Sequence, residues 1–233
     1  MVASFYVQNF GCRATQADGA AIERQFEDQG MERAAALSEA GIVVLNTCTV
    51  TTGADQDARA AIRRVRRQNP EARIVVTGCY AQRAPEEIAA LPGVDIVIGN
   101  SHKHQLAEIA IYGPVTVETP RTAFVPLAGL TENRKLKTEN SIFVSDIFAH
   151  TELLAAPVFD AANERTRPNL KVQDGCDNRC SFCVIPYVRG QSRSLGMDRI
   201  VREVNTLVDA GYREVVISGI NLGRWGRDLA NTS

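Results

Sequence analysis

Short runs of apolar, β-branched residues alternate along the first half of the chain with longer stretches in which apolar residues recur at helical spacing. This alternation predicts βαβ units, and hence a parallel sheet with helices on both faces. The expected strands are residues 5–8, 42–45, 74–77, 95–98 and 115–118. The expected helices are residues 17–29, 55–68, 85–90 and 102–111. The sequence therefore predicts an α/β fold whose amino-terminal domain is a doubly wound parallel sheet.

A change of pattern divides the rest of the chain. Residues 1–127 are expected to form the amino-terminal domain, 128–167 a connector with some local order, and 168–233 the start of a second α/β unit. In that unit we expect strands over residues 169–173 and 214–218 and a helix over residues 197–210. This makes about two β/α units, whereas a barrel of this kind needs roughly six to eight. We therefore expect an incomplete second domain and interpret the chain as a fragment.

Composition narrows the class of protein. Hydrophobic residues make up 45% of the chain and charged residues 23%, with a formal net charge of -1, which is typical of a globular domain. Near-neutral charge argues against a protein that coats nucleic acid generally, although a local basic patch remains compatible with it. No run approaches the roughly 20 apolar residues of a membrane helix, and no secretory signal begins the sequence. We expect a cytoplasmic protein without a membrane span.

Three of the six cysteines are clustered: Cys176, Cys180 and Cys183 follow a C-x3-C-x2-C spacing after an apolar strand. A closed zinc site or a closed cubane cluster uses four ligands, so three thiolates favour a cluster with one open iron. Zinc with a distant fourth ligand is an alternative, but the histidines lie well upstream without the usual spacing. A disulfide framework is disfavoured because cytosolic thiols stay reduced.

The remaining cysteines are scattered in sequence but share one structural position. Cys12, Cys48 and Cys79 each follow the carboxyl end of one of the first three expected strands. In open parallel sheets, sites form at that edge, so the three thiols are candidates for a second metal site. Gly11 and Gly78 permit tight turns beside two of them. Three buried structural cysteines are the alternative, and chain geometry alone leaves both open.

The carboxyl-terminal cysteine loop, with aromatic Phe182 before its last thiol, resembles the signature loop of radical S-adenosylmethionine enzymes. The resemblance implies that Cys176, Cys180 and Cys183 hold a [4Fe-4S] cluster whose open iron binds S-adenosylmethionine. Electron transfer into the sulfonium would then give a 5'-deoxyadenosyl radical. It also implies a partial (β/α) barrel for the second domain, of which this chain holds the beginning.

The amino-terminal motifs extend the resemblance. Gly11–Cys12, Asn46–Thr51 and Gly78–Gln82, followed by the radical loop, are similar to the methylthiotransferase family over nearly the whole chain. This implies that Cys12, Cys48 and Cys79 hold a second, auxiliary [4Fe-4S] cluster that carries the inserted sulfur. Two clusters and S-adenosylmethionine are therefore the expected cofactors. We expect both clusters to face one cavity.

Two motifs point to a branch of that family. Asn46–Thr51 with Ala54–Asp55, and Gly219–Gly223, resemble the branch that adds a methylthio group to N6-threonylcarbamoyladenosine beside the anticodon of tRNA. Phe182, Gly219 and Asn221 are the expected cofactor-binding residues, and no acid or base side chain is assigned as catalytic. A methylthiotransferase for a ribosomal protein and a cluster-binding remnant without turnover are the alternatives.

Basic residues suggest where partners bind. Five arginines between Arg59 and Arg67 crowd one expected helix and suit tRNA phosphates, although a solvated helix face would look the same. Arg189 and Arg193, just after the cysteine loop, are candidates to hold a substrate or cofactor carboxylate through a bidentate guanidinium. We expect a monomer that acts on tRNA and receives electrons from an external donor.

Overall fold

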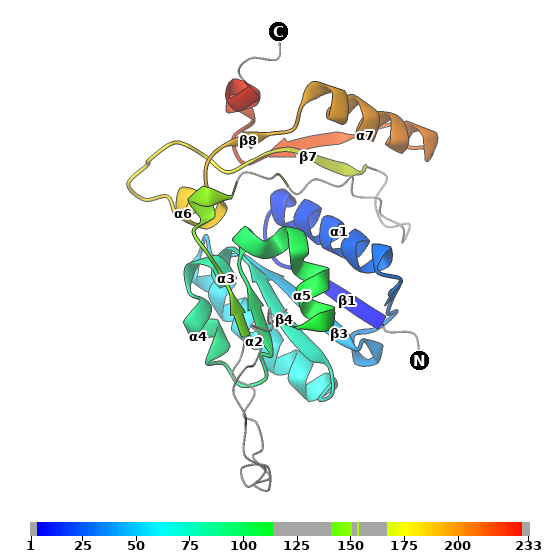
Figure 1. The fold of residues 1–233 in the computed structure, drawn as a ribbon, viewed down its shortest axis with the longest axis vertical. Coiled ribbons are helices and arrows are strands. Elements are labelled where there is room, and N and C mark those ends of the chain that lie inside the picture. Colours follow the sequence, from blue (N-terminus) through cyan, green and yellow to red (C-terminus); the bar gives the residue numbers. More distant parts are fainter. Residues whose placement is uncertain (1–3, 114–140, 151–152, 154–166, 230–233) are drawn as a thin grey trace, which may run out of the picture.

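The computed structural model describes residues 4–113, 141–150, 153 and 167–229. Two sheets are formed in these ranges, and helix α1 (Arg13–Asp28) lies between them (Figure 1). The strands of the first sheet are β1 (Ser4–Asn9), β2 (Glu32–Arg33), β3 (Ile42–Thr47), β4 (Arg73–Gly78), β5 (Ile96–Ile98) and β6 (Ser141–Phe143). The other helices of this part are α2 (Thr52–Gln68), α3 (Cys79–Arg83), α4 (Pro85–Ala89) and α5 (Leu106–Tyr112), with 3-10 turns at η1 (Leu37–Glu39), η2 (Asn100–Gln105) and η4 (Ile147–Ala149).

The first sheet is parallel throughout and has the strand order β2-β1-β3-β4-β5-β6. From β1 the chain winds one way to β2, and from β3 it winds the other way out to β6. The switch in winding direction therefore lies between β1 and β3, where ligand sites form in sheets of this order. The register pairs Asn9 with Asn46 and Thr47 with Gly78, so the carboxyl ends of the three cysteine-bearing strands lie at one edge.

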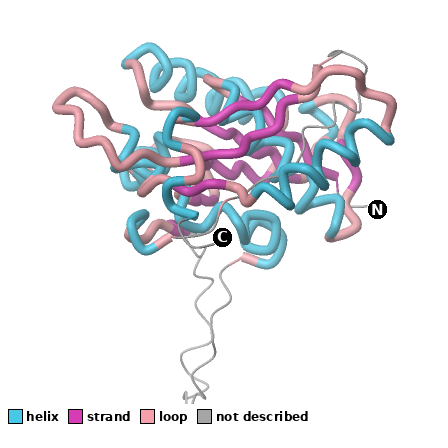
Figure 2. The backbone as a smooth tube through the Cα atoms, turned by 90° about the horizontal axis from the view of Figure 1, so that it is seen from above, coloured by secondary structure: helices cyan, strands magenta, loops and turns pink. Residues whose placement is uncertain are grey.

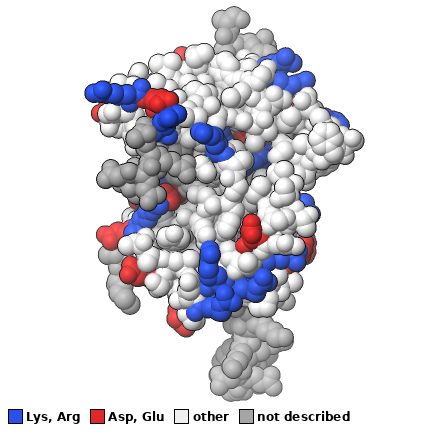
Figure 3. Space-filling model, turned by 180° about the vertical axis from the view of Figure 1, so that it is seen from behind, with Lys and Arg blue, Asp and Glu red and all other residues white. Residues whose placement is uncertain are grey.

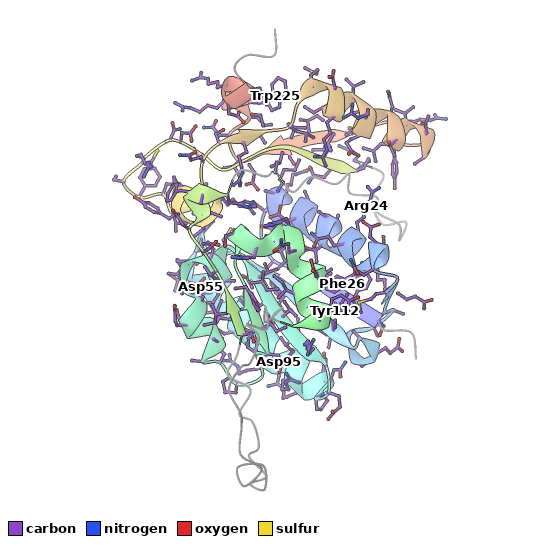
Figure 4. All side chains as sticks on the ribbon, in the orientation of Figure 1. Arg24, Phe26, Asp55, Asp95, Tyr112 and Trp225 are labelled. Atoms are coloured by element: carbon purple, nitrogen blue, oxygen red, sulfur yellow. The ribbon has the colours of Figure 1, made fainter. Side chains whose placement is uncertain are left out.

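Helices cover both faces of this sheet because its central strands are apolar on both sides. Val43 and Leu45 of β3 pack with α2 and α4 in one core, whereas Val44 packs with α1 and α5 in the other. On the α1 face, the rings of Phe5 in β1 and Phe26 in α1 stack with centroids 4.9 Å apart, and Figure 4 labels Phe26 near the end of α1. Each such fully buried side chain contributes about 1.5–3 kcal/mol relative to its exposed state. The doubly wound prediction is confirmed.

The second sheet has the order β8-β7-β9, with β7 parallel to β9 and antiparallel to β8. Its elements are β7 (Asn169–Asp174), α6 (Ile185–Arg189), β8 (Arg193–Ser194), α7 (Met197–Asp209), β9 (Val216–Gly219), η5 (Leu222–Arg224) and η6 (Arg227–Leu229). Leu170 and Val172 of β7 form a small core, and the Trp225 indole closes it by donating to Leu195 O at 3.0 Å (Figure 4). The predicted β/α unit of this part is thus confirmed.

Some sequence expectations lie outside the described residues, and some described elements differ from those expected. The expected strand 115–118 and the predicted domain boundary at residue 127 lie outside the described residues. Strand β6 comes from the segment expected to be a connector, and it pairs with β5. Strands β2 and β8 have two residues each, too few to show an alternating pattern. None of the described helices is both long enough and apolar enough to cross a membrane.

Candidate metal centres

The first three cysteines lie where parallel strands end. Cys12 is the N-cap residue of α1, Cys48 directly follows β3, and Cys79 begins α3 directly after β4. Cys48 and Cys79 are buried, whereas Cys12 is exposed. All three therefore stand at the carboxyl edge of the first sheet, on both sides of its switch point, as the strand pattern predicted.

Cys48 lies within electrostatic reach of Cys12 and of Cys79. Burial raises the pKa of Cys48, and negative charge on Cys79 and Cys12 raises it further. Burial also acts to raise the pKa of Cys12, but hydrogen bonds from the Thr15 backbone and side chain and the charge of Arg189 outweigh it and lower the value. The Cys12 Sγ lies 3.6 Å from the Thr15 hydroxyl. Of Cys12 and Cys48, the exposed Cys12 is therefore the thiol that ionises more readily.

The donor chemistry of this edge fits an iron-sulfur cluster better than a hard cation. Thiolates are soft ligands, and three of them leave one iron of a cubane open. Over the described ranges, no three His, Cys, Asp or Glu side chains close on a single point as ligands of one ion would. The three thiols stand at one edge of the sheet, and as soft ligands they would suit a cluster there.

Two glycines shape the backbone here. Gly11 has φ 104°, and a Cβ on it would lie 2.7 Å from Cys48 Cβ. Gly78 has φ 98°, and a Cβ there would lie 2.3 Å from Thr47 O. Both values of φ are in the region that favours glycine. The tight turns predicted at these glycines are present, and the Cys48 side chain and the backbone of Thr47 approach them closely.

A buried ion cluster lies beside this edge and joins the two sheets. Asp18 of α1 accepts hydrogen bonds from Lys103 Nζ at 3.1 Å and Arg189 Nη2 at 3.1 Å, and also from Lys171. Asp174 at the end of β7 accepts from Lys171 Nζ at 2.9 Å and from Arg189 Nη1 at 2.9 and 3.1 Å. The described cluster holds more cationic than acidic groups, which suits anionic ligands nearby.

Sequence analysis missed most of this cluster. Lys171 interrupts the apolar run of β7, and Asp18 interrupts an alanine-rich stretch of α1, so each was a signal of a buried polar partner. The interpretation of Arg189 needs correction. Its guanidinium does contact carboxylates, but they belong to the same chain: Nη1 donates to Asp174 and Nη2 to Asp18, and the side chain is only 2% exposed.

The second cysteine set lies in the loop between β7 and α6. Cys176 N donates to Gly190 O at 3.0 Å, which closes the base of the loop, and Cys183 N donates to Cys180 O at 3.1 Å. Gly175, with φ 70°, lies so close to Gln191 that a Cβ would meet its carbonyl oxygen at 1.9 Å. Cys180 is exposed, and the other two thiols are half-buried. The loop therefore presents its thiols outward from a fixed base.

Gln173 links this loop to the end of β9. Its fully buried Nε2 donates to Asp174 O, Gly175 O and Ser192 Oγ, and its Oε1 accepts from Asn221 N at 2.7 Å. The Asn221 Nδ2 lies 3.6 Å from Cys176 Sγ. A Cβ on Gly219 would lie 3.0 Å from Gln173 Cβ. Gln173 was absent from the expected site residues, although a glutamine in a buried strand was a signal.

The expected cofactor residues fall into two groups. Gly219 and Asn221 lie against the base of the cysteine loop. Phe182 projects from the loop with 92% of its surface exposed and is not packed against them. The structure thus places two of the three together beside Cys176.

The arginines of α2 have different surroundings. Arg66 donates hydrogen bonds to four acceptors: Pro70 O, Ala72 O, Gly93 O and Asp95 Oδ2. Asp95 lies at the edge of the sheet away from the cysteines (Figure 4). Arg59 pairs with Tyr80 and Glu87. Arg63 and Arg67 are exposed. Figure 3 shows basic side chains gathered low on the face opposite that of Figure 1.

Comparison with known proteins agrees with this geometry. Residues 4–99 match the model of the uncharacterized protein family UPF0004, and residues 170–221 match that of the radical SAM superfamily. A solved radical S-adenosylmethionine methyltransferase, TsrM from Kitasatospora setae, is similar over 96% of this chain and 49% of its own, with a TM-score of 0.53 and 17% identity. This likeness supports the fold, in which a doubly wound α/β domain is followed by a second, smaller α/β unit.

Curated relatives narrow the family. The threonylcarbamoyladenosine tRNA methylthiotransferases MtaB of Bacillus subtilis and Aquifex aeolicus are 37% and 39% identical over 98% and 95% of this chain, and 46% and 48% of their own lengths. A tRNA-2-methylthio-N(6)-dimethylallyladenosine synthase of Zymomonas mobilis is 34% identical over 98% of this chain and 46% of its own length. The chain is similar to these methylthiotransferases over nearly its whole length, and it spans about half the length of these curated relatives.

Proposed function

We propose that this chain is the cluster-binding half of a tRNA methylthiotransferase that converts N6-threonylcarbamoyladenosine to its 2-methylthio derivative. The observation that carries the proposal is the placement of two cysteine triads on two sheets that share α1 and the buried ion cluster. The charge of Arg189, six residues after Cys183, reaches Cys12 on the first sheet. The names of the B. subtilis and A. aeolicus relatives support N6-threonylcarbamoyladenosine as the nucleoside.

The residues take distinct roles in this proposal. Cys12, Cys48 and Cys79 would hold one [4Fe-4S] cluster, and Cys176, Cys180 and Cys183 the other. Together with S-adenosylmethionine, the clusters would supply the electron, the radical and the transferred sulfur. Gln173 fixes the base of the second loop, and Asn221 donates toward Cys176 Sγ. The charge of Arg189 contributes to the lowered pKa of Cys12 and so favours its thiolate form, and the buried Lys103 ammonium lies within electrostatic reach of Cys79.

Iron content tests the cluster assignment directly. Anaerobic reconstitution of the chain should give about eight irons, because each triad would hold one four-iron cube. The triple variants Cys176→Ala/Cys180→Ala/Cys183→Ala and Cys12→Ala/Cys48→Ala/Cys79→Ala should each retain about four. If the chain bound about four irons and the first variant none, Cys12, Cys48 and Cys79 would be structural and methylthio transfer would be excluded.

The nucleoside is tested in a chimera. Residues 1–233 are joined to the complementary second half of the B. subtilis relative and expressed in a strain that lacks its own enzyme. Mass spectrometry of tRNA nucleosides should then detect 2-methylthio-N6-threonylcarbamoyladenosine, and the Cys79→Ala chimera should yield none. If 2-methylthio-N6-dimethylallyladenosine were detected instead, the chain would act on dimethylallyladenosine in tRNA, as the name of the Z. mobilis relative indicates for that protein. A modified ribosomal protein with unmodified tRNA would favour the protein-directed alternative.

The cytoplasmic location, the monomeric state and the external electron donor stay predictions. They accord with a tRNA substrate.

A further inference from the structure

Asn100 lies at the contact between the two cysteine sites. It begins η2, directly after β5 and Gly99, and only 9% of its surface is exposed. Its Nδ2 donates to Val188 O of α6 at 2.7 Å and lies 3.8 Å from Cys79 Sγ. One amide thus touches a thiol of the first triad and the helix that follows the second triad. Helices α3 and α6 are neighbours at this junction (Figure 1).

The orientation of the amide follows from its partners. A backbone carbonyl only accepts hydrogen bonds, so the amide nitrogen, not the oxygen, must face Val188 O. An amide nitrogen carries two hydrogens, so the second is available to the sulfur. The opposite atom, Oδ1, has no hydrogen-bond partner in the described part of the chain, and Asn100 lines a cavity of about 20 Å³ with Arg193 and His104. The geometry therefore assigns an N–H donor to Cys79 Sγ.

Helix α6 also reaches the second triad, through the carboxyl end of the helix. Gly190, just after α6, accepts the hydrogen bond from Cys176 N at 3.0 Å. Arg189 of α6 is clamped by Asp18 and Asp174. A short path of hydrogen bonds and rigid backbone therefore runs from Cys79 through Asn100 and α6 to Cys176. Movement of the second loop would shift the donor that faces Cys79.

We propose that Asn100 is a positioning residue that hydrogen-bonds the sulfur of Cys79 and makes the reduction potential of the amino-terminal cluster depend on the docking of α6. This rests on the proposed function, because it requires a cluster on Cys12, Cys48 and Cys79. Hydrogen bonds to cluster sulfurs stabilise the more negative, reduced state and so raise the potential. Outer partners of metal ligands typically contribute about 10–100-fold to affinity.

The test measures the potential of the amino-terminal cluster by itself. In the Cys176→Ala/Cys180→Ala/Cys183→Ala background, Asn100→Leu keeps the branched shape of the side chain but removes both N–H donors, and Asn100→Ser keeps a single hydroxyl donor. Gln105→Ala is the matched control, because this side chain is exposed on the same turn. Redox titration monitored by electron paramagnetic resonance gives the midpoint potential, and iron competition with a chelator gives the affinity.

We expect the potential to fall in Asn100→Leu, to fall less in Asn100→Ser, and to stay unchanged in Gln105→Ala, with about 10-fold weaker iron retention in Asn100→Leu. An Asn100→Leu or Asn100→Ser protein that retains its cluster at an unchanged potential would overturn the assignment, even if its melting temperature fell. An amino-terminal triad that binds no iron in the unsubstituted background would instead overturn the proposed function, and this inference with it.

Discussion

Arg189 Nη2 lies 3.1 Å from Asp18 Oδ2, and this ion pair joins residues 171 positions apart in the chain. Both side chains are 2% exposed. Buried charges of this kind are tolerated only when they are paired and hydrogen-bonded. The contact therefore ties the helix after the second cysteine loop to α1, whose first turn follows Cys12.

Removing the Asp18 carboxylate should destabilise the chain strongly. Asp18→Asn leaves Lys103, Lys171 and Arg189 buried with one carboxylate fewer, and loss of one partner of a buried pair costs about 3–5 kcal/mol. Urea unfolding of the apoprotein measures the change. Asp57→Asn, at an exposed position of α2, is the control and should change stability by no more than about 0.5 kcal/mol. Equal losses in both variants would show that the cluster does not stabilise the fold.

Titration of the Asp18 carboxylate should make the unfolding free energy depend on pH in the acid range. Burial acts to raise the pKa of Asp18, but Lys103, Lys171 and Arg189 outweigh it and lower the value to about 2. An unfolded aspartate has a pKa of about 3.9. Because the folded value is the lower one, the stabilisation is present above about pH 4 and is lost as the pH falls toward 2. The unfolding free energy of the apoprotein should therefore fall over this window, and less steeply in Asp18→Asn.

Gly11 is predicted to be required for the amino-terminal site because of space as well as backbone conformation. Gly11→Ala and Gly30→Ala both place alanine at positive φ, which costs roughly 1 kcal/mol. Only the Gly11 variant also places a Cβ against Cys48, because a Cβ added at Gly30 would have no atom within 4 Å. In reconstitution, Gly11→Ala should lose iron from the first triad while Gly30→Ala keeps it. Equal iron contents would contradict this reason.

Gly219 is predicted to be required at the base of the second loop. In Gly219→Ala the Cβ would lie 2.9 Å from Leu222 Cδ2 and 3.1 Å from Gln173 Oε1, which would displace the acceptor of Asn221 N. Overpacking of this kind costs about 1–3 kcal/mol. Gly223→Ala is the control, because its nearest neighbour is 3.8 Å away. Iron bound in the Cys12→Ala/Cys48→Ala/Cys79→Ala background should fall in the first variant and not in the second.

The arginines of α2 should separate into structural and RNA-binding residues. Arg66→Ala removes four hydrogen bonds and should lower the unfolding free energy by about 1–3 kcal/mol. Arg63→Ala and Arg67→Ala change exposed side chains and should leave stability unchanged. If they contact phosphates, each should reduce the slope of log affinity for tRNA against log salt by about 1. Unchanged slopes would show that Arg63 and Arg67 do not contact phosphates and only face solvent.

The sequence by itself determined the order of elements and the position of the cysteines along it. Apolar strands such as Ile42–Thr47 are read from their composition, and cysteines that directly follow parallel strands must reach one edge of the sheet. Figure 2 shows strands running side by side across the molecule. Local pattern was sufficient here because burial and strand geometry are local properties.

Only the tertiary structure decided which charges meet. Asp18 lies 153 and 171 positions from Lys171 and Arg189, and a charge inside an apolar stretch signals a buried partner without showing which residue that partner is. Pairing them requires α1 to lie between two sheets, an arrangement set by the packing of both cores. The amide of Asn100 likewise acquires its two partners, Cys79 and Val188, only through that docking. Long-range ion pairs and hydrogen bonds leave no periodic signal in sequence, since their partners are chosen by the fold as a whole.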